Sequence, residues 1–308
     1  MRNVISCEFL DIDHFREQLR GWDTPAIQID PGKLSIRLNS IDLGGLIFFD
    51  VRVNRRVIDH SRIEDGWLSF VISLSPAVFC GIEVDPGRLT VLTPGREYRS
   101  VLSNNWHSIE IVVSVSVFEE EGLWLPPHFA DPECATIPLP VELAGIFYCL
   151  AEAAFNGKEA VDEARLRGAL LRALDKALRI GARGRDTLHP GRAVEGYRLT
   201  QQMVRYIESR FGQRIAVNDV ARELNVTPRA LHYAARSTFG MSPLDLILAF
   251  RLNHVRNELW DMRMSEANVT RAALMQDFGH LGRFSQQYSV LFGELPSQTL
   301  QRIRSIVA

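Results

Sequence analysis

Several kinds of segment are missing from this sequence. No apolar run approaches the ~18 residues that a membrane-spanning helix needs. The N-terminus also lacks the apolar core of a signal peptide, because acidic residues interrupt it early. We therefore expect a cytoplasmic protein with no membrane partner. Free thiols are expected rather than a disulfide framework or a zinc site, because no C-x-x-C pair occurs among Cys7, Cys80, Cys134 and Cys149.

Motifs of common catalytic sites are missing as well. The chain has no glycine-rich phosphate loop and no G-x-S-x-G nucleophile elbow. A metal-dependent β-barrel enzyme would need two histidines close together on one strand, with a carboxylate and a third histidine. No His-x-His occurs, and the N-terminal histidines stand apart at His14, His60, His107 and His128. We expect no enzyme, no catalytic residues, no metal and no cofactor.

Lysine is absent from the C-terminal third. Residues 1–180 hold 18 Lys+Arg against 26 Asp+Glu, a balance of −8, whereas residues 181–308 hold 17 arginines against 11 acids, a balance of +6. Arginine stays charged and binds phosphate through two parallel hydrogen bonds. A basic region without lysine suggests a nucleic-acid partner, with an ordinary solvated helical surface as the alternative.

The chain is long enough for two domains. Its 308 residues exceed the usual size of one hydrophobic core. Over residues 1–130, short β-branched and aromatic runs alternate with Pro-Gly turns, which is typical of an antiparallel barrel or jelly roll. Residues 181–196 are polar and glycine-containing and resemble a linker, and residues 197–308 show only helical patterns. The predicted fold is therefore a two-domain α+β protein with an all-α C-terminal domain.

Two amphipathic helices are predicted over residues 131–180, between the β-rich region and the linker. The second carries a leucine stripe at Leu166, Leu170, Leu171, Leu174 and Leu178. These helices either pack on the sheet or on each other, or form a homodimer surface over residues 141–180.

A short phrase, Phe-Gly-x-x-Pro, occurs twice near the C-terminus, with Gly240 and Gly293 lying 53 residues apart. Glycine ends helices readily and proline starts them, so each copy predicts one helix ending and the next beginning. The residues upstream of the two copies also match, which makes the whole unit a repeat.

The first copy follows a helix-turn-helix pattern. Ala221 lies on the apolar face of a short helix, and Asn225, which tolerates positive φ, follows four residues later. Thr227 then offers an N-cap oxygen before Pro228 at the first helical position. The inward residues Leu231 and Ala234 follow on a second helix, as a helix-turn-helix requires.

The second copy has the same spacing between the inward alanine and the turn. Ala273 and Asp277 are again four residues apart, although aspartate tolerates the left-handed region less well than glycine. The inward residues of the following helix are Phe284, Tyr288 and Leu291. A helix of about 20 residues, 243–262, joins the copies and would be ~30 Å long, close to the ~34 Å between adjacent major-groove turns.

Residues 199–306 resemble the DNA-binding domain of the AraC/XylS family of transcription regulators. The resemblance rests on Ala221, "NVTPRALHY", "GMSP", "FRLNHVRNEL", Ala273, Phe278, Phe284, Tyr288 and "FGELP". Two further stretches, "HLGRF" and "LPSQTL", resemble the branch that contains the ethanolamine-operon regulator. This sequence departs from the family pattern in having Ala235 where phenylalanine is usual, and Asn225 and Asp277 where glycine is usual.

The motif predicts that outward residues on the second helix of each copy contact operator DNA. On the first they are Thr227, Arg229, His232, Tyr233 and Arg236; on the second they are Leu281, Arg283, Ser285, Gln286 and Gln287. Arginine can pair with guanine and glutamine with adenine. Arg229, His232, Arg283 and Gln286 are the expected base contacts.

The resemblance further implies a regulator, more often an activator than a repressor, that works with RNA polymerase and responds to a small molecule. The aromatic residues on predicted strands, Phe48, Trp67, Phe70 and Trp106, are candidates for the effector pocket or for plain core. An amine effector, which the branch resemblance suggests, would need a carboxylate such as Glu64 or Glu110. The alternatives are an enzyme or repair protein that uses the helical domain only for targeting, and a regulator that needs no effector.

Overall fold

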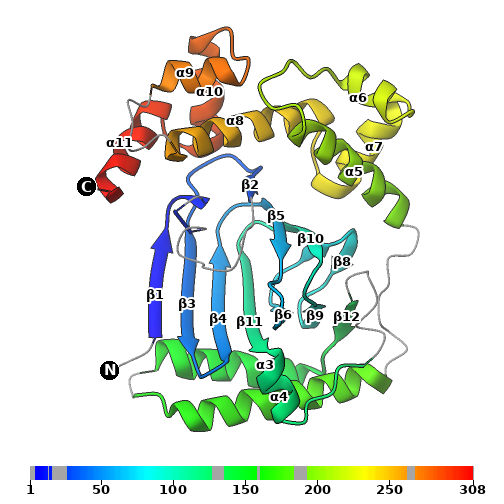
Figure 1. Cartoon of the computed structure of the whole chain (residues 1–308), viewed down its shortest axis with the longest axis vertical. Helices are drawn as coiled ribbons and strands as arrows, with labels where there is room; N and C mark the ends of the chain where they lie inside the picture. Colours follow the sequence, from blue (N-terminus) through cyan, green and yellow to red (C-terminus); the bar gives the residue numbers. More distant parts are fainter. Residues whose placement is uncertain are drawn as a thin grey trace. The chain divides into compact units, whose positions relative to one another are not determined.

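The computed structural model describes residues 4–12, 14–15, 26–126, 135–157, 160–183, 193–261 and 268–307. The chain forms two compact units: the first is Met1–Pro25 with Ser35–Gly191, and the second is Ala26–Leu34 with Arg192–Ala308. Antiparallel sheets belong to the first and a helical domain to the second, so the fold is mixed α+β (Figure 1). His128, Cys134 and most of the expected linker over residues 181–196 lie outside the described residues.

The first unit is built on a sheet of seven described strands, in which all neighbours are antiparallel. The strand order is β1 (Val4–Phe9), β3 (Ile36–Asp42), β4 (Leu46–Val53), β11 (Trp106–Ser114), β6 (Trp67–Ser73), β9 (Arg88–Leu92) and β12 (Ala135–Pro138).

Four further strands of this unit pair antiparallel in the order β5 (Val57–Arg62), β10 (Glu97–Leu102), β7 (Ala77–Phe79) and β8 (Ile82–Val84). Neither strand order returns to its first strand. The antiparallel β-rich region is therefore confirmed, and closure into a barrel or jelly roll stays a prediction.

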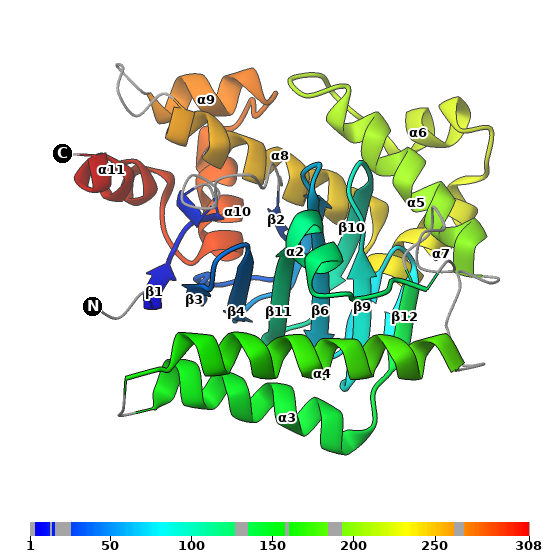
Figure 2. The same ribbon diagram turned by 60° about the horizontal axis from the view of Figure 1, so that its bottom comes forward.

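Helices cover one face of the larger sheet. After the short α2 (Val115–Glu120), the chain forms α3 (Val141–Ala151), a π-helical turn η2 (Glu152–Asn156) and α4 (Glu163–Arg183). Helices α3 and α4 lie side by side along the sheet (Figure 2). The predicted leucine stripe of α4 is buried in one core with sheet residues such as Phe48, Phe70 and Ile111. These helices therefore pack on the sheet and on each other.

The second unit is helical apart from the short β2 (Ile27–Gln28). Its helices are α5 (Ala193–Glu208), α6 (Val217–Glu223), α7 (Pro228–Phe239), α8 (Pro243–Asp261), α9 (Val269–Met275), α10 (Leu281–Phe292) and α11 (Pro296–Val307). Figure 1 shows α8 running between the α6–α7 pair and the α9–α10 pair. Among the described helices, none combines the length and the apolar character needed to cross a bilayer.

Candidate functional sites

The two helix-turn-helix units have the same backbone turn. Asn225 and Asp277 both adopt a left-handed conformation, with φ of 53° and 58°. The next amide in each unit bonds back to the inward alanine: Val226 N donates to Ala221 O at 2.9 Å, and Phe278 N donates to Ala273 O at 3.1 Å. The predicted four-residue spacing from alanine to turn is therefore confirmed in both copies.

Arg251 supports the second turn from α8. Its Nε donates to the carbonyl oxygen of Gln276 at 2.9 Å, and its Nη2 donates to the same oxygen. The guanidinium also lies 3.7 Å from Asp277 Oδ2 and stacks over the Phe278 ring at 4.4 Å. These contacts stabilise an aspartate at a position where glycine is the usual residue. Sequence reasoning assigned no role to Arg251, although it lies in the stretch "FRLNHVRNEL" that carries the family resemblance.

Both Phe-Gly-x-x-Pro phrases end a helix as predicted. Gly240 and Gly293 are the C-caps of α7 and α10, both left-handed with φ of 68°. The second phrase is also fixed by its own acid, because Glu294 pairs with Arg256 at 3.3 Å and with Arg302 at 2.9 Å. Although burial opposes ionisation, these arginines and hydrogen bonds hold the pKa of Glu294 below its usual value.

The predicted DNA-facing side chains of α7 are exposed. Leu231, Ala234 and Ala235 are buried, which turns the opposite face outward. That face carries Arg229, His232, Tyr233 and Arg236, of which Tyr233 is 76% exposed. Thr227 caps the helix, since its hydroxyl accepts a hydrogen bond from Ala230 N at 3.2 Å.

Helix α10 presents a similar face. Phe284, Tyr288 and Leu291 are buried as predicted. The exposed stripe carries Leu281, Arg283 and Gln286, and Ser285 and Gln287 are partly exposed. The candidate residues of the second copy are therefore at least partly accessible to solvent.

Three arginines on these faces are exposed and have no side-chain partner among the described residues. Within the described part of the chain, no ion pair or side-chain hydrogen bond engages Arg229, Arg236 or Arg283. By contrast, Arg256 is buried in its pair with Glu294. Exposed guanidinium groups without a partner are suited to bases and phosphates, and Arg229 and Arg283 lie in the first turn of their helices.

Comparison with known proteins agrees with this geometry. Residues 220–302 match the family described as a helix-turn-helix domain. Over 107 residues the chain is 34% identical to XylDLEGF operon transcriptional activator 2 of Pseudomonas putida, covering 35% of this chain and 68% of that protein. The chain belongs to the AraC/XylS family of DNA-binding transcription regulators.

Other members of this family match over the same third of the chain. XylDLEGF operon transcriptional activator 3 of P. putida is 34% identical over 108 residues, which is 35% of this chain but only 33% of that protein. A solved structure of a probable AraC family transcriptional regulator from Rhodopseudomonas palustris CGA009 has 34% identity over 35% of this chain and 98% of its own, with a TM-score of 0.33.

The aromatic residues proposed for an effector pocket do not come together. Phe48 and Phe70 belong to the core under the helices, where Phe48 stacks on Phe155 and Phe70 on Phe118. Trp106 is buried and contacts Phe79, and it lies on the other face of β11 from core residues Ile109 and Ile111. Trp67 is partly exposed at the start of β6.

The face of the larger sheet opposite the helices carries a group of buried polar residues. The strand register sets Ser108 beside Ser73 and Val112 beside Ser69, so these serines share a face with Glu110. Thr90 joins the same face through its pairing with Val71, the cross-strand neighbour of Glu110. The hydroxyls of Ser69, Ser73 and Thr90 are buried without a hydrogen-bond partner in the described structure. We call Glu110, Asp59 and these three hydroxyls the polar cluster.

Two carboxyl groups of the polar cluster are electrostatically coupled. Burial raises the pKa of Glu110 to about 7, opposed by the hydrogen bond from Ser108 Oγ at 2.8 Å and assisted by the charge of Asp59. Burial also raises the pKa of Asp59, which accepts hydrogen bonds from Ser61 and from Ser100 at 3.3 Å. Glu110, one of the two acids nominated for an amine, is thus buried among unsatisfied polar atoms, whereas Glu64 is exposed.

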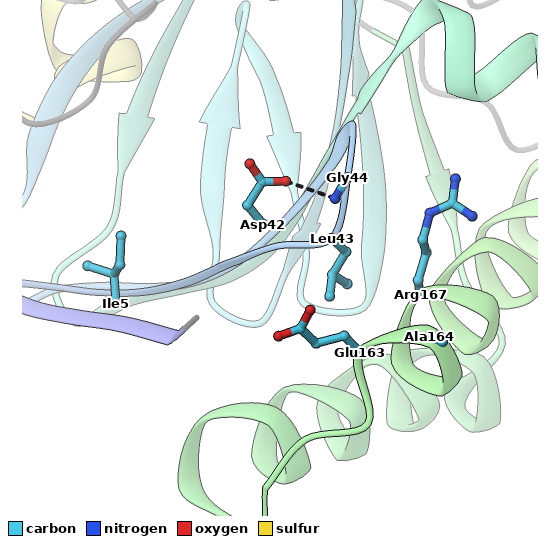
Figure 3. Close-up of a pocket in the computed structure, with 7 residues that line it drawn as sticks. All are labelled: Ile5, Asp42, Leu43, Gly44, Glu163, Ala164 and Arg167. Atoms are coloured by element: carbon cyan, nitrogen blue, oxygen red, sulfur yellow. Dashed lines mark hydrogen bonds between the residues drawn. The ribbon is translucent and has the colours of Figure 1, made fainter. Parts of the chain in front are cut away.

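A separate pocket of about 780 Å³ lies at the end of α4 (Figure 3). Two of its polar residues have partners: Asp42 Oδ1 accepts from Gly44 N at 2.9 Å, and Arg167 pairs with Glu121 at 2.6 Å. Within the described ranges, no three His, Cys, Asp or Glu side chains gather in a way that could hold a metal ion.

Replacing Arg251 by lysine should destabilise the second unit by about 1–2 kcal/mol, because lysine keeps the charge but loses the planar two-donor contact with Gln276 O. Urea unfolding of the full chain measures this loss. The matched control is Arg222→Lys, whose exposed ion pair with Asp219 should contribute less than about 0.5 kcal/mol. Equal losses for the two variants would contradict the role given to Arg251.

The stability of the first unit should fall as pH rises from about 4.5 to about 7. In this window the unfolded chain has lost the Glu110 proton while the folded chain keeps it, so rising pH favours unfolding, by up to about 3 kcal/mol. Thermal unfolding between pH 5 and 8 should show the decrease in the native chain and in Glu64→Gln, but a clearly smaller one in Glu110→Gln. A slope unchanged by Glu110→Gln would contradict this assignment.

Proposed function

We propose that the chain binds duplex operator DNA through both α7 and α10, each in one of two adjacent major-groove segments. The observation that carries this proposal is the pair of equivalent turns, each followed by a helix that presents unpaired arginine. Helix α8 has 19 residues and is therefore ~28 Å long. This length suits two reading helices that contact neighbouring turns of a duplex, ~34 Å apart.

The base contacts are assigned to Arg229 and His232 on α7 and to Arg283 and Gln286 on α10. Arginine donates two hydrogen bonds to guanine, and glutamine pairs with adenine. Tyr233 and Arg236 lie on the same side of α7 as Arg229, and Gln287 lies one turn after Arg283 on α10. These residues and Ser285 serve the backbone or flanking bases. Backbone amides at the starts of helices hold phosphate independently of the side chains.

We assign this regulator an activating role. Both relatives compared above carry the word activator in their names, and that role is carried over from them. RNA polymerase is then its protein partner at the promoter. A homodimer through α3 is part of the same proposal, because Val141, Ile146 and Tyr148 leave apolar surface exposed on that helix.

The first unit is proposed as the effector-sensing unit, with the polar cluster as its recognition site. Buried hydroxyls without partners are costly, and a polar ligand or ordered water offsets that cost. Two nearby carboxyl groups favour a cation, because a bound ammonium would relieve the repulsion between them. A small amine is therefore the effector class that fits Glu110 and Asp59, in keeping with the resemblance to the ethanolamine-operon branch.

The double variant Arg229→Ala/Arg283→Ala should lose specific DNA binding while keeping its fold. Each arginine contributes about 1–3 kcal/mol of base discrimination, so the pair should lower affinity by about 100-fold or more. The measurement is a gel shift on a duplex enriched from random DNA by the native chain. Arg37→Ala/Arg62→Ala removes the same charge from exposed positions of the first unit and serves as the control. Unchanged affinity in the first variant would rule out α7 and α10 as the reading helices.

Small primary amines and amino alcohols should raise the thermal unfolding temperature of the native chain, because a ligand that binds only the folded state stabilises it. Glu110→Gln should abolish the rise, and Glu64→Gln should retain it. Matched alcohols without the amine should give no shift. Equal shifts in the native chain and in Glu110→Gln would exclude the polar cluster as the amine site.

A further inference from the structure

Residues 26–34, which we call the inserted segment, belong to the second unit although strands of the first unit flank them in the sequence. The chain therefore passes between the units at residues 25–26 and 34–35 as well as at 191–192. The β-rich composition of residues 1–130 gave no sign of this arrangement.

The inserted segment is hydrogen-bonded to α8 through Asn253. Gln28 N donates to Asn253 Oδ1 at 3.0 Å, and Asn253 Nδ2 donates to Gln28 O at 2.9 Å. Asn253 is only 3% exposed, and its Nδ2 also donates to Ala249 O at 2.8 Å. One buried side chain thus satisfies both backbone groups of Gln28, which fixes the segment on the helix.

The inserted segment also ends α10. The last carbonyls of a helix have no partner within it, and here the segment supplies two donors to one of them. Gln28 Nε2 and Gly32 N donate to Leu291 O, at 2.8 and 3.0 Å. The same Nε2 lies within hydrogen-bond distance of Asp30 O and Gly32 O, so the Gln28 amide joins the fold of the segment to the end of α10.

Gly293 shows how closely the segment is packed. A Cβ atom added at Gly293 would lie 2.8 Å from Lys33 N and 2.9 Å from Lys33 Cγ. The second Phe-Gly-x-x-Pro phrase therefore needs its glycine for two reasons: the left-handed φ and the approach of the segment. Gly240, with the same φ of 68°, provides a matched site for the first reason.

The segment also lies close to the candidate base-reading side chains. A groove of about 390 Å³ in the second unit is lined on one side by Ile29 and Pro31 of the segment. Gln286 and Gln287 of α10 line it as well. A shift of the segment would therefore reach both the end and the middle of the second reading helix.

We propose that Gln28 is a positioning residue for the second reading helix, so that the DNA-binding unit consists of the C-terminal helices together with residues 26–34. The inference rests on the proposed reading of two DNA segments. If Gln28 has this role, recognition by α10 depends on the inserted segment, which continues directly into β3 of the first unit. Recognition by α7 does not depend on the inserted segment.

The test uses the full chain and a duplex selected from random DNA by the native protein. Two derivative duplexes have one half or the other scrambled, and the half read by α10 is the one whose scrambling removes the effect of Arg283→Ala. Gln28→Met keeps the side-chain size but removes the amide donors. It should weaken binding to the intact duplex at least tenfold, and binding to the duplex with a scrambled α10 half less than twofold. The control Gln202→Met, at an exposed site on α5, should change neither value.

Gly293→Ala and Gly240→Ala give an independent comparison, because both introduce a side chain at the same φ. Gly293→Ala should reproduce the loss confined to the α10 half, and Gly240→Ala should not.

Two results would overturn the inference and leave two-segment reading intact. One is that Gln28→Met binds within twofold of the native chain, and the other is that it loses affinity equally for both halves. If Gln28→Met does not fold, the two glycine variants decide the question by the same criterion. A native chain that is insensitive to scrambling one half would overturn two-segment reading itself, and the inference with it.

Discussion

Helix α8 is buried along most of its length, and both helix-turn-helix units pack against it. Apolar residues on all its sides, among them Leu246, Phe250, Val255 and Leu259, are almost fully covered. A helix that is apolar all round must be enclosed by other elements, and here those elements include α7, α9 and α11. The spacing between the two proposed reading helices, α7 and α10, is therefore set by the length of one element.

The two copies of the repeat reach the same backbone by different means. In the first copy, Asn225 occupies the left-handed turn position, which asparagine tolerates by itself. The second, with Asp277, is supported by Arg251 at the turn, by Arg256 and Arg302 at Glu294, and by the inserted segment at the end of α10. Helix α10 is therefore held in place partly by residues far away in the sequence, including residues 26–34.

Local chemistry made much of the second unit predictable. Helix ends follow from Thr227, Gly240 and Gly293, and the inward residues follow from helical periodicity. Arg251 and Gln28 could not be found this way, because their partners are backbone carbonyls far along the chain, which leave no pattern in the side chains.

The first unit was predictable only in part. Period-2 alternation predicts which residues share a face with Phe48 on β4 and with Phe70 on β6. It does not predict which face the helices cover, because that depends on long-range packing. Those phenylalanines lie in that core, and the polar residues Ser69, Ser73 and Glu110 lie on the other face. The sequence therefore does not reveal that buried hydroxyls of Ser69 and Ser73, without partners among the described residues, lie beside Glu110 on that face.

Hydroxyl-radical footprinting of the full chain on a selected duplex tests the central claim most directly. Two reading helices joined by α8 should protect two stretches of the duplex whose centres lie about 10 base pairs apart on one face. A single protected stretch, or two stretches on opposite faces of the duplex, would contradict the account.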